Sequence, residues 1–131
     1  MIGLDTNLLI RYLTKDDPQQ FAKVTQTIER AVAEDERLLI NCAVLCEVTW
    51  VLETAYEYSR GEIGDALEQI LETAQFDVER ADEARLALGD FRATKAGFAD
   101  ALIGRINRAL GAKHTATFDR DLKGLDTFRV V

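Results

Sequence analysis

Short apolar runs alternate along this chain with longer segments in which apolar residues recur every three or four positions. The short runs predict five β-strands, at residues 1–5, 37–40, 75–78, 114–118 and 127–131. The longer segments predict helices, at residues 8–13, 18–34, 43–56, 63–71, 81–91 and 99–110. Strands that alternate with helices favour an α/β fold, in which helices cover both faces of a parallel sheet.

Polar residues and glycines indicate where these elements begin and end. Thr6 or Asn7 is expected to cap the first helix, and Pro18 fits the first turn of the second. The Arg60-Gly61 pair interrupts the helical pattern. Gly111 fits the position that follows the last helix. The 131 residues are expected to form a single domain, 1–131.

Four acidic residues lie in or beside apolar runs, where a carboxylate is costly unless a cation compensates it. They are Asp5 in I-G-L-D-T-N, Glu47 in L-C-E-V-T-W, Asp100 in G-F-A-D-A-L-I and Asp119 in T-A-T-F-D-R-D-L. Asp5 ends the first predicted strand and Asp119 directly follows the fourth, at the sheet edge where α/β folds bind ligands. Glu47 lies three residues after Val44 and four before Val51, which predicts a place on the buried side of its helix.

Each acid taken singly also has an ordinary structural explanation. Asp5 and Asp100 suit helix N-termini, Asp119 suits a strand-to-helix turn, and Glu47 suits a border position that reaches solvent. Taken together, carboxylates that converge repel one another and bind a divalent cation such as Mg²⁺ or Mn²⁺. Such ions activate water and neutralise phosphate charge, so the pattern favours metal-assisted hydrolysis.

The net charge of −7 is unevenly distributed along the chain. Residues 1–84 contain 7 basic and 18 acidic side chains, whereas residues 85–131 contain 9 basic and 5 acidic ones. One interpretation is ordinary solvated helix faces, and the other is a basic rim that faces phosphates beside an acidic centre. The basic candidates for phosphate contacts in the second interpretation are Arg92, Lys95, Arg105 and Arg108.

The cysteines, the histidine and the N-terminus add no other chemistry. Cys42 and Cys46 are expected to be reduced, half-buried thiols of one helix. His114 is the single histidine and is interpreted as an ordinary strand-end residue. No apolar stretch approaches the roughly 20 residues of a membrane helix, and no signal peptide is visible, so a cytoplasmic protein is expected.

The ordered set of acidic motifs resembles that of the PIN-domain nucleases. L-D-T-N-L-L-I-R-Y-L opens the chain, a glutamate within a helix follows, and F-A-D-A-L-I and A-T-F-D-R-D-L complete the set. The opening and the short length are most similar to the VapC-type toxins of type II toxin–antitoxin pairs. The resemblance spans nearly the whole chain.

This resemblance implies a three-layer α/β/α sandwich around a central parallel β-sheet. It also implies a single-stranded RNA endonuclease that needs Mg²⁺ or Mn²⁺ and leaves 5′-phosphate and 3′-hydroxyl ends. The family's catalytic and metal-binding acids match Asp5, Glu47, Asp100 and Asp119, and supporting positions match Asn7, Thr117 and Asp121. Asp119 and Asp121 are both available as the fourth acid.

The family also implies a cognate VapB-type antitoxin, which blocks the acidic site from a hydrophobic groove, and pairing as a homodimer. Trp50, Tyr56 and Tyr12 are candidates for such surfaces, although Trp50 is interpreted first as a core residue.

Two other function classes compete with the nuclease. A catalytically silent PIN-like module would bind RNA or a protein without cutting, but it would not need four costly acids. Receiver domains and haloacid-dehalogenase-like phosphatases also place an aspartate after the first strand. The phosphatases require a second acid two residues later, where this chain has Asn7.

Overall fold

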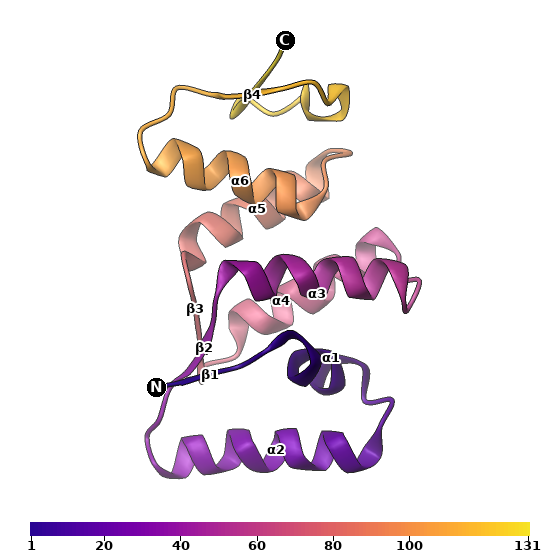
Figure 1. Cartoon of the computed structure of the whole chain (residues 1–131), viewed down its shortest axis with the longest axis vertical. Helices are drawn as coiled ribbons and strands as arrows, with labels where there is room; N and C mark the ends of the chain where they lie inside the picture. Colours follow the sequence, from indigo (N-terminus) through magenta and orange to yellow (C-terminus); the bar gives the residue numbers. More distant parts are fainter. The chain divides into compact units, whose positions relative to one another are not determined.

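The computed structural model describes all 131 residues, which form two compact units, Met1–Glu79 and Arg80–Val131. The first unit contains, in chain order, β1 (Ile2–Gly3), α1 (Thr6–Thr14), α2 (Pro18–Ala33), β2 (Leu38–Ile40), α3 (Cys42–Thr54), α4 (Arg60–Glu72) and β3 (Phe76–Val78). The second contains α5 (Ala81–Ala93), α6 (Phe98–Ala109), β4 (Thr115–Thr117), the 3₁₀ turn η1 (Arg120–Leu122) and β5 (Phe128–Val130) (Figure 1). The five strands and six helices lie where the apolar periodicity predicts them.

The first unit is built on a parallel sheet in the order β1-β2-β3. Leu38 of the central strand pairs with Ile2 on one side and with Phe76 on the other. Leu38 and Ile40 are fully buried, as are Leu9 of α1 and Leu45 of α3. Every strand pair is parallel, which confirms the predicted α/β class with parallel strands.

Two helix starts in the first unit differ from the predictions. Asp5, rather than Thr6 or Asn7, caps α1, because its carboxylate accepts a hydrogen bond from the amide of Leu8 at 3.0 Å. The predicted break at Arg60-Gly61 is wrong, because α4 begins at Arg60. Ser59 and Glu62 form a capping box there, which satisfies the first amides of the helix.

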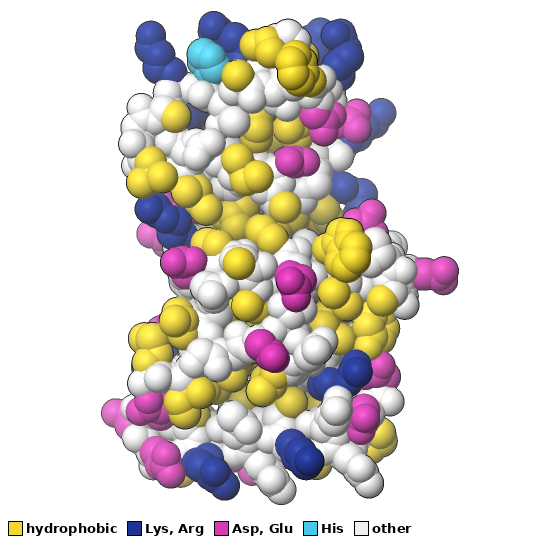
Figure 2. All heavy atoms as spheres, in the orientation of Figure 1, with side chains coloured by type: hydrophobic (Ala, Val, Ile, Leu, Met, Phe, Trp, Pro, Cys, Tyr) yellow, Lys and Arg dark blue, Asp and Glu magenta, His cyan; other side chains and the backbone are white.

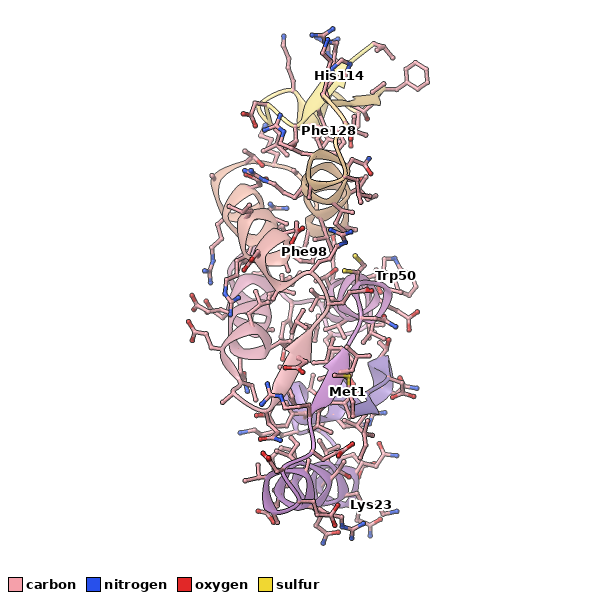
Figure 3. The ribbon with its side chains drawn as sticks, turned by 90° about the vertical axis from the view of Figure 1, so that its left-hand side faces the viewer. Met1, Lys23, Trp50, Phe98, His114 and Phe128 are labelled. Atoms are coloured by element: carbon pink, nitrogen blue, oxygen red, sulfur yellow. The ribbon has the colours of Figure 1, made fainter.

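The second unit pairs β4 with β5 in parallel, with Thr115 opposite Phe128 and Thr117 opposite Val130. Helix α6 packs against this sheet, and the amide of Asn107 donates to the hydroxyl of Thr115 at 2.9 Å. Phe128 lies at the α6 ribbon in Figure 3. Gly111 has a φ of +103°, which confirms it as the left-handed residue after the helix.

One large side chain contradicts the sequence-based interpretation of the core. Trp50 is 64 % exposed and projects outward from α3 (Figure 3), so the core interpretation is wrong. The buried stripe of α3 is Leu45, Val48 and Leu52, which recur at helical spacing, and Trp50 lies off this stripe. None of the helices combines the length and the apolar character that crossing a membrane requires.

Candidate active site

The first unit carries two of the predicted acids, both with exposed side chains. Asp5 follows β1 and begins α1, and its carboxylate oxygen Oδ1 accepts the Leu8 amide. Asn7 is exposed in the first turn of the same helix. The end of β1 and the start of α1 therefore bring a carboxylate and an amide side chain to the same edge of the first sheet.

Glu47 lies on an exposed face of α3, so its predicted place on the buried side of that helix is wrong. Val44 and Val51, which suggested that side, are only half-buried. The fully buried positions of α3 are offset from them by one residue. A carboxylate at this exposed position remains hydrated and needs no partner to offset burial.

The second unit brings the other two acids close to each other. Asp100 is the third residue of α6, where the helix dipole favours a negative charge, and its side chain is half-buried. The pKa of Asp100 nevertheless lies above its ordinary value of 3.8. Burial is the larger cause and the negative charge of Asp119 is the second. Asp100 and Asp119 are therefore near enough to repel each other.

A hydrogen-bonded turn fixes Asp119 at the end of β4. The backbone amide of Asp119 donates to the Thr117 hydroxyl at 3.0 Å. The Asp119 carboxylate in turn accepts the amide of Asp121 at 2.9 Å and caps η1. Asp119 and Asp121 are both exposed. Thr117 thus supports Asp119 through the backbone, in the place where a supporting hydroxyl was expected.

Two of the four predicted phosphate-binding cations already hold carboxylates. Arg105 donates through two nitrogens to Asp90, at 2.7 and 2.8 Å, in a bidentate pair that joins α5 to α6. Asp90 raises the pKa of Arg105, chiefly through these hydrogen bonds. Arg108 binds the backbone carbonyl and the carboxylate of Asp126. Arg92 and Lys95, at the end of α5 and in the following loop, have exposed side chains.

Phe118 is an exposed aromatic residue that the acidic motifs do not include, and it lies between the supporting Thr117 and the acid Asp119. Its side chain is 86 % exposed, although it is aromatic and directly follows a strand. The signal for it was available, because period-2 alternation along β4 places Phe118 on the face opposite Thr117.

The four acids divide equally between the two units, with Asp5 and Glu47 in the first and Asp100 and Asp119 in the second. Neither unit by itself gathers three or more Asp, Glu, His or Cys side chains that could hold a metal ion. The acids that the structure brings together within one unit are Asp100 and Asp119.

Comparisons with known proteins give the family. A family model described as PIN domain matches residues 2–127. A VapC ribonuclease of Aquifex aeolicus (strain VF5) is 27 % identical over 122 residues, which are 93 % of this chain and 90 % of that protein. No solved structure gives a significant match. Because the matched residues are nearly the whole chain and include all four acids, this chain belongs to the PIN-domain family.

Proposed function

We propose that this chain is a metal-dependent endonuclease of single-stranded RNA that acts as the toxin of a type II toxin–antitoxin pair. Membership of the PIN-domain family and the likeness to a protein named VapC ribonuclease support this proposal. The proposal treats residues 1–131 as one PIN-like domain, because the family model spans both units.

The proximity of Asp100 and Asp119 carries the proposal. Two carboxylates that repel each other, one of them half-buried, are more stable with a cation between them. Their hard oxygen atoms suit Mg²⁺ or Mn²⁺ rather than a softer metal, which would prefer thiolate or imidazole ligands. The residues present therefore fit a divalent cation of this kind.

The four acids have two kinds of role in the proposed reaction. Asp5, Asp100 and Asp119 would hold the ion, and Glu47 would complete the site or orient the attacking water. A bound Mg²⁺ or Mn²⁺ supplies an activated water and neutralises charge on the phosphate. Thr117 holds the turn that carries Asp119, and Asn7 presents its amide in the first turn of the helix that Asp5 caps. The products would carry 5′-phosphate and 3′-hydroxyl ends.

The proposed partners are an RNA substrate, a cognate VapB-type antitoxin and a second copy of the chain. The exposed Trp50 supplies apolar surface of the kind that protein interfaces bury. Tyr12 and Tyr56 are half-buried and already engaged. Tyr12 packs against Phe21 and Phe76, whereas the Tyr56 hydroxyl binds Asp16. Trp50 is therefore the most available of the three aromatic candidates.

Cleavage of a mixed pool of single-stranded RNA by the purified protein tests the proposed function. Cleavage is expected with Mg²⁺ or Mn²⁺ and is expected to stop when EDTA removes the ion. The variant Asp100→Asn should lose cleavage while it keeps its fold. Asp82→Asn, which removes an exposed acid of α5 in the same unit, is the matched control and should cut at the wild-type rate.

Two outcomes would change the proposal. An Asp100→Asn protein that cuts RNA at the full rate would remove Asp100 from the mechanism. A wild-type protein that binds RNA but cuts none with either ion would favour the silent module instead. The variants Asp119→Asn and Asp121→Asn, compared side by side, would decide which of the two is the fourth acid.

A further inference from the structure

The small sheet of the second unit has one covered face and one open face. Thr115 and Phe128 pair across the sheet and face α6, where Asn107 binds the Thr115 hydroxyl and an atom added at Gly104 would meet the Phe128 ring. Ala116 and Arg129 form the next pair, and both are exposed. Because successive side chains of a strand alternate between faces, the pair Ala116 and Arg129 marks the open face.

Phe118 follows the C-terminal end of β4, the end that carries Asp119. It lies two residues beyond Ala116 and just past the end of β4, where continued alternation would place it toward the open face, and it immediately precedes Asp119. An aromatic ring that is 86 % exposed gains nothing from the core of its own unit. The hydrogen bonds of Thr117 and Asp119 hold the backbone on both sides of Phe118, so the ring has a fixed base.

Four basic residues occur in the sequence on either side of Phe118. Lys113, Arg120, Lys123 and Arg129 all have exposed side chains, and none of them forms an ion pair. In Figure 2, lysine and arginine side chains gather around the histidine of this unit, beside an apolar patch. An exposed ring next to β4 and an exposed arginine on the open face of the same sheet have the complementary chemistry for a nucleotide, because the base has an apolar face and the phosphate is anionic.

We propose that Phe118 is the platform on which a base of single-stranded RNA stacks next to the cleaved phosphate, and that Arg129 contacts a flanking phosphate. This inference rests on the proposed function and deepens it, because it names the residue that positions the substrate. Every base has a π-face, so stacking on Phe118 orients the strand without selecting a sequence. Phe118 and Asp119 are adjacent residues with Cα atoms about 3.8 Å apart, so a base on the ring and the phosphate at the acidic centre would belong to neighbouring nucleotides.

Binding of a short fluorescent RNA, followed by polarisation in the Asp100→Asn background, tests the platform directly. A series of RNAs that each lack one base should show one position at which loss of the base weakens binding about tenfold. The Phe118→Ala change should weaken binding of the intact RNA by a similar factor. It should also remove the effect of that single abasic position, because the base and the ring act as a pair.

Matched variants separate stacking from general apolar contact. Phe118→Tyr should bind like the parent protein, whereas Phe118→Leu should bind like Phe118→Ala, because leucine offers no aromatic face. Leu110→Ala removes another exposed apolar side chain of the same unit and should leave binding unchanged. Arg129→Gln should weaken all RNAs of the series equally and reduce the salt dependence of binding.

The outcomes that overturn the inference differ from those that overturn the proposed function. Equal binding by the parent and Phe118→Ala, or additive losses from the protein and RNA changes, would refute the platform. So would a Phe118→Ala protein whose oligomeric state changes while its RNA affinity does not, since the ring would then belong to a protein interface. Cleavage by the wild-type protein in Mg²⁺ is a separate readout, so its failure would refute the nuclease and leave the stacking result interpretable.

Discussion

Asp100 and Asp119 lie near enough that burial of Asp100 and, second, the negative charge of Asp119 raise the pKa of Asp100, although Asp100 lies in the first turn of α6, where the helix dipole favours a carboxylate. Burial of Asp100 is the larger cause of the same shift. Both causes destabilise the ionised folded protein, and both are what a cation would relieve. With the proposed ion site, the pair would exchange stability of the metal-free protein for binding of the ion.

This exchange predicts that Asp100→Asn stabilises the metal-free protein. A carboxyl group with a raised folded pKa weakens the fold once the pH exceeds its unfolded value, 3.8. The neutral amide avoids this effect, so Asp100→Asn should raise the Tm in EDTA at pH 7. Addition of Mg²⁺ should raise the Tm of the wild type more than that of the variant. Thermal unfolding followed by circular dichroism checks both expectations, and a lower Tm for the variant in EDTA would contradict them.

A second prediction concerns the turn that holds Asp119. Thr117→Val removes the hydroxyl that accepts the Asp119 amide, and a hydrogen bond of this kind contributes about 0.5–1.5 kcal/mol. The loss also gives the turn more freedom. We therefore expect the activation free energy of cleavage to rise by more than the free energy of unfolding falls. The measurements are kcat with a fixed RNA substrate and the free energy of unfolding in urea. Thr117→Ser keeps the hydroxyl and should restore kcat, and failure of that rescue would exclude the hydrogen bond as the cause.

Local sequence patterns were sufficient to locate the elements of this fold. All five strands and six helices were predicted, because the apolar periodicity reports burial of each element on its own. The strand ends were less accurate. The strand predicted at 1–5 extends in the structure only over Ile2–Gly3, since Asp5 caps the following helix. Asp5 could either extend the strand or cap the helix. Its hydrogen bonds decide which of the two it does, and periodicity does not report them.

The errors at Glu47 and Trp50 have a common cause. Several positions of α3 are apolar, so the sequence offers more than one candidate buried face. The prediction for Glu47 rests on its spacing from Val44 and Val51, whereas packing buries Leu45, Val48 and Leu52. The bidentate pair of Arg105 and Asp90 could not be predicted from the sequence either, because it joins two helices across 15 positions of sequence. Contacts between elements depend on the tertiary fold, which no single-element pattern encodes.

A third prediction follows from the close approach of α6 to the second sheet. A Cβ atom at Gly104 would lie 2.5 Å from the Phe128 ring and 2.8 Å from the Thr127 hydroxyl. Thr127 is fully buried and cannot move without disturbing the core of the unit, and the half-buried Phe128 ring would have to shift away from α6. We expect Gly104→Ala to destabilise the protein by about 1–3 kcal/mol, the usual cost of overpacking.

Gly89→Ala is the matched control for this change. Gly89 is an exposed residue inside α5, and no atom lies within 4 Å of a Cβ added there. Alanine favours the helix over glycine by about 0.5–1 kcal/mol, so Gly89→Ala should stabilise the protein. Urea unfolding of the two variants should give changes of opposite sign. A stabilised Gly104→Ala protein would show that the helix and the sheet do not approach as closely as described.

The last prediction concerns a polar network in the first unit. The Tyr56 hydroxyl donates to Asp16 at 2.7 Å, and the guanidinium of Arg11 donates to the Tyr56 oxygen at 2.8 Å. The hydroxyl of Thr14 lies 2.8 Å from the other Asp16 oxygen. The hydrogen bond from Tyr56 is the first cause that lowers the pKa of Asp16 below its ordinary value of 3.8, and the one from Thr14 is the second. The network joins the turn between α1 and α2 to Tyr56, two residues after the end of α3.

The sign of the resulting pH dependence follows from this direction. A carboxyl group with a lowered folded pKa stabilises the fold above its unfolded value of 3.8, and this contribution is lost as the pH falls through the folded pKa. Tyr56→Phe should therefore lower the Tm at pH 7, and the difference from wild type should shrink as the pH falls below 3.8. Tyr58→Phe is the control, because the Tyr58 hydroxyl forms no hydrogen bond with Asp16, and it should not produce this pH dependence. A Tm difference for Tyr56→Phe that stays constant with pH would mean that Tyr56 stabilises the unit by packing and not through the charge of Asp16.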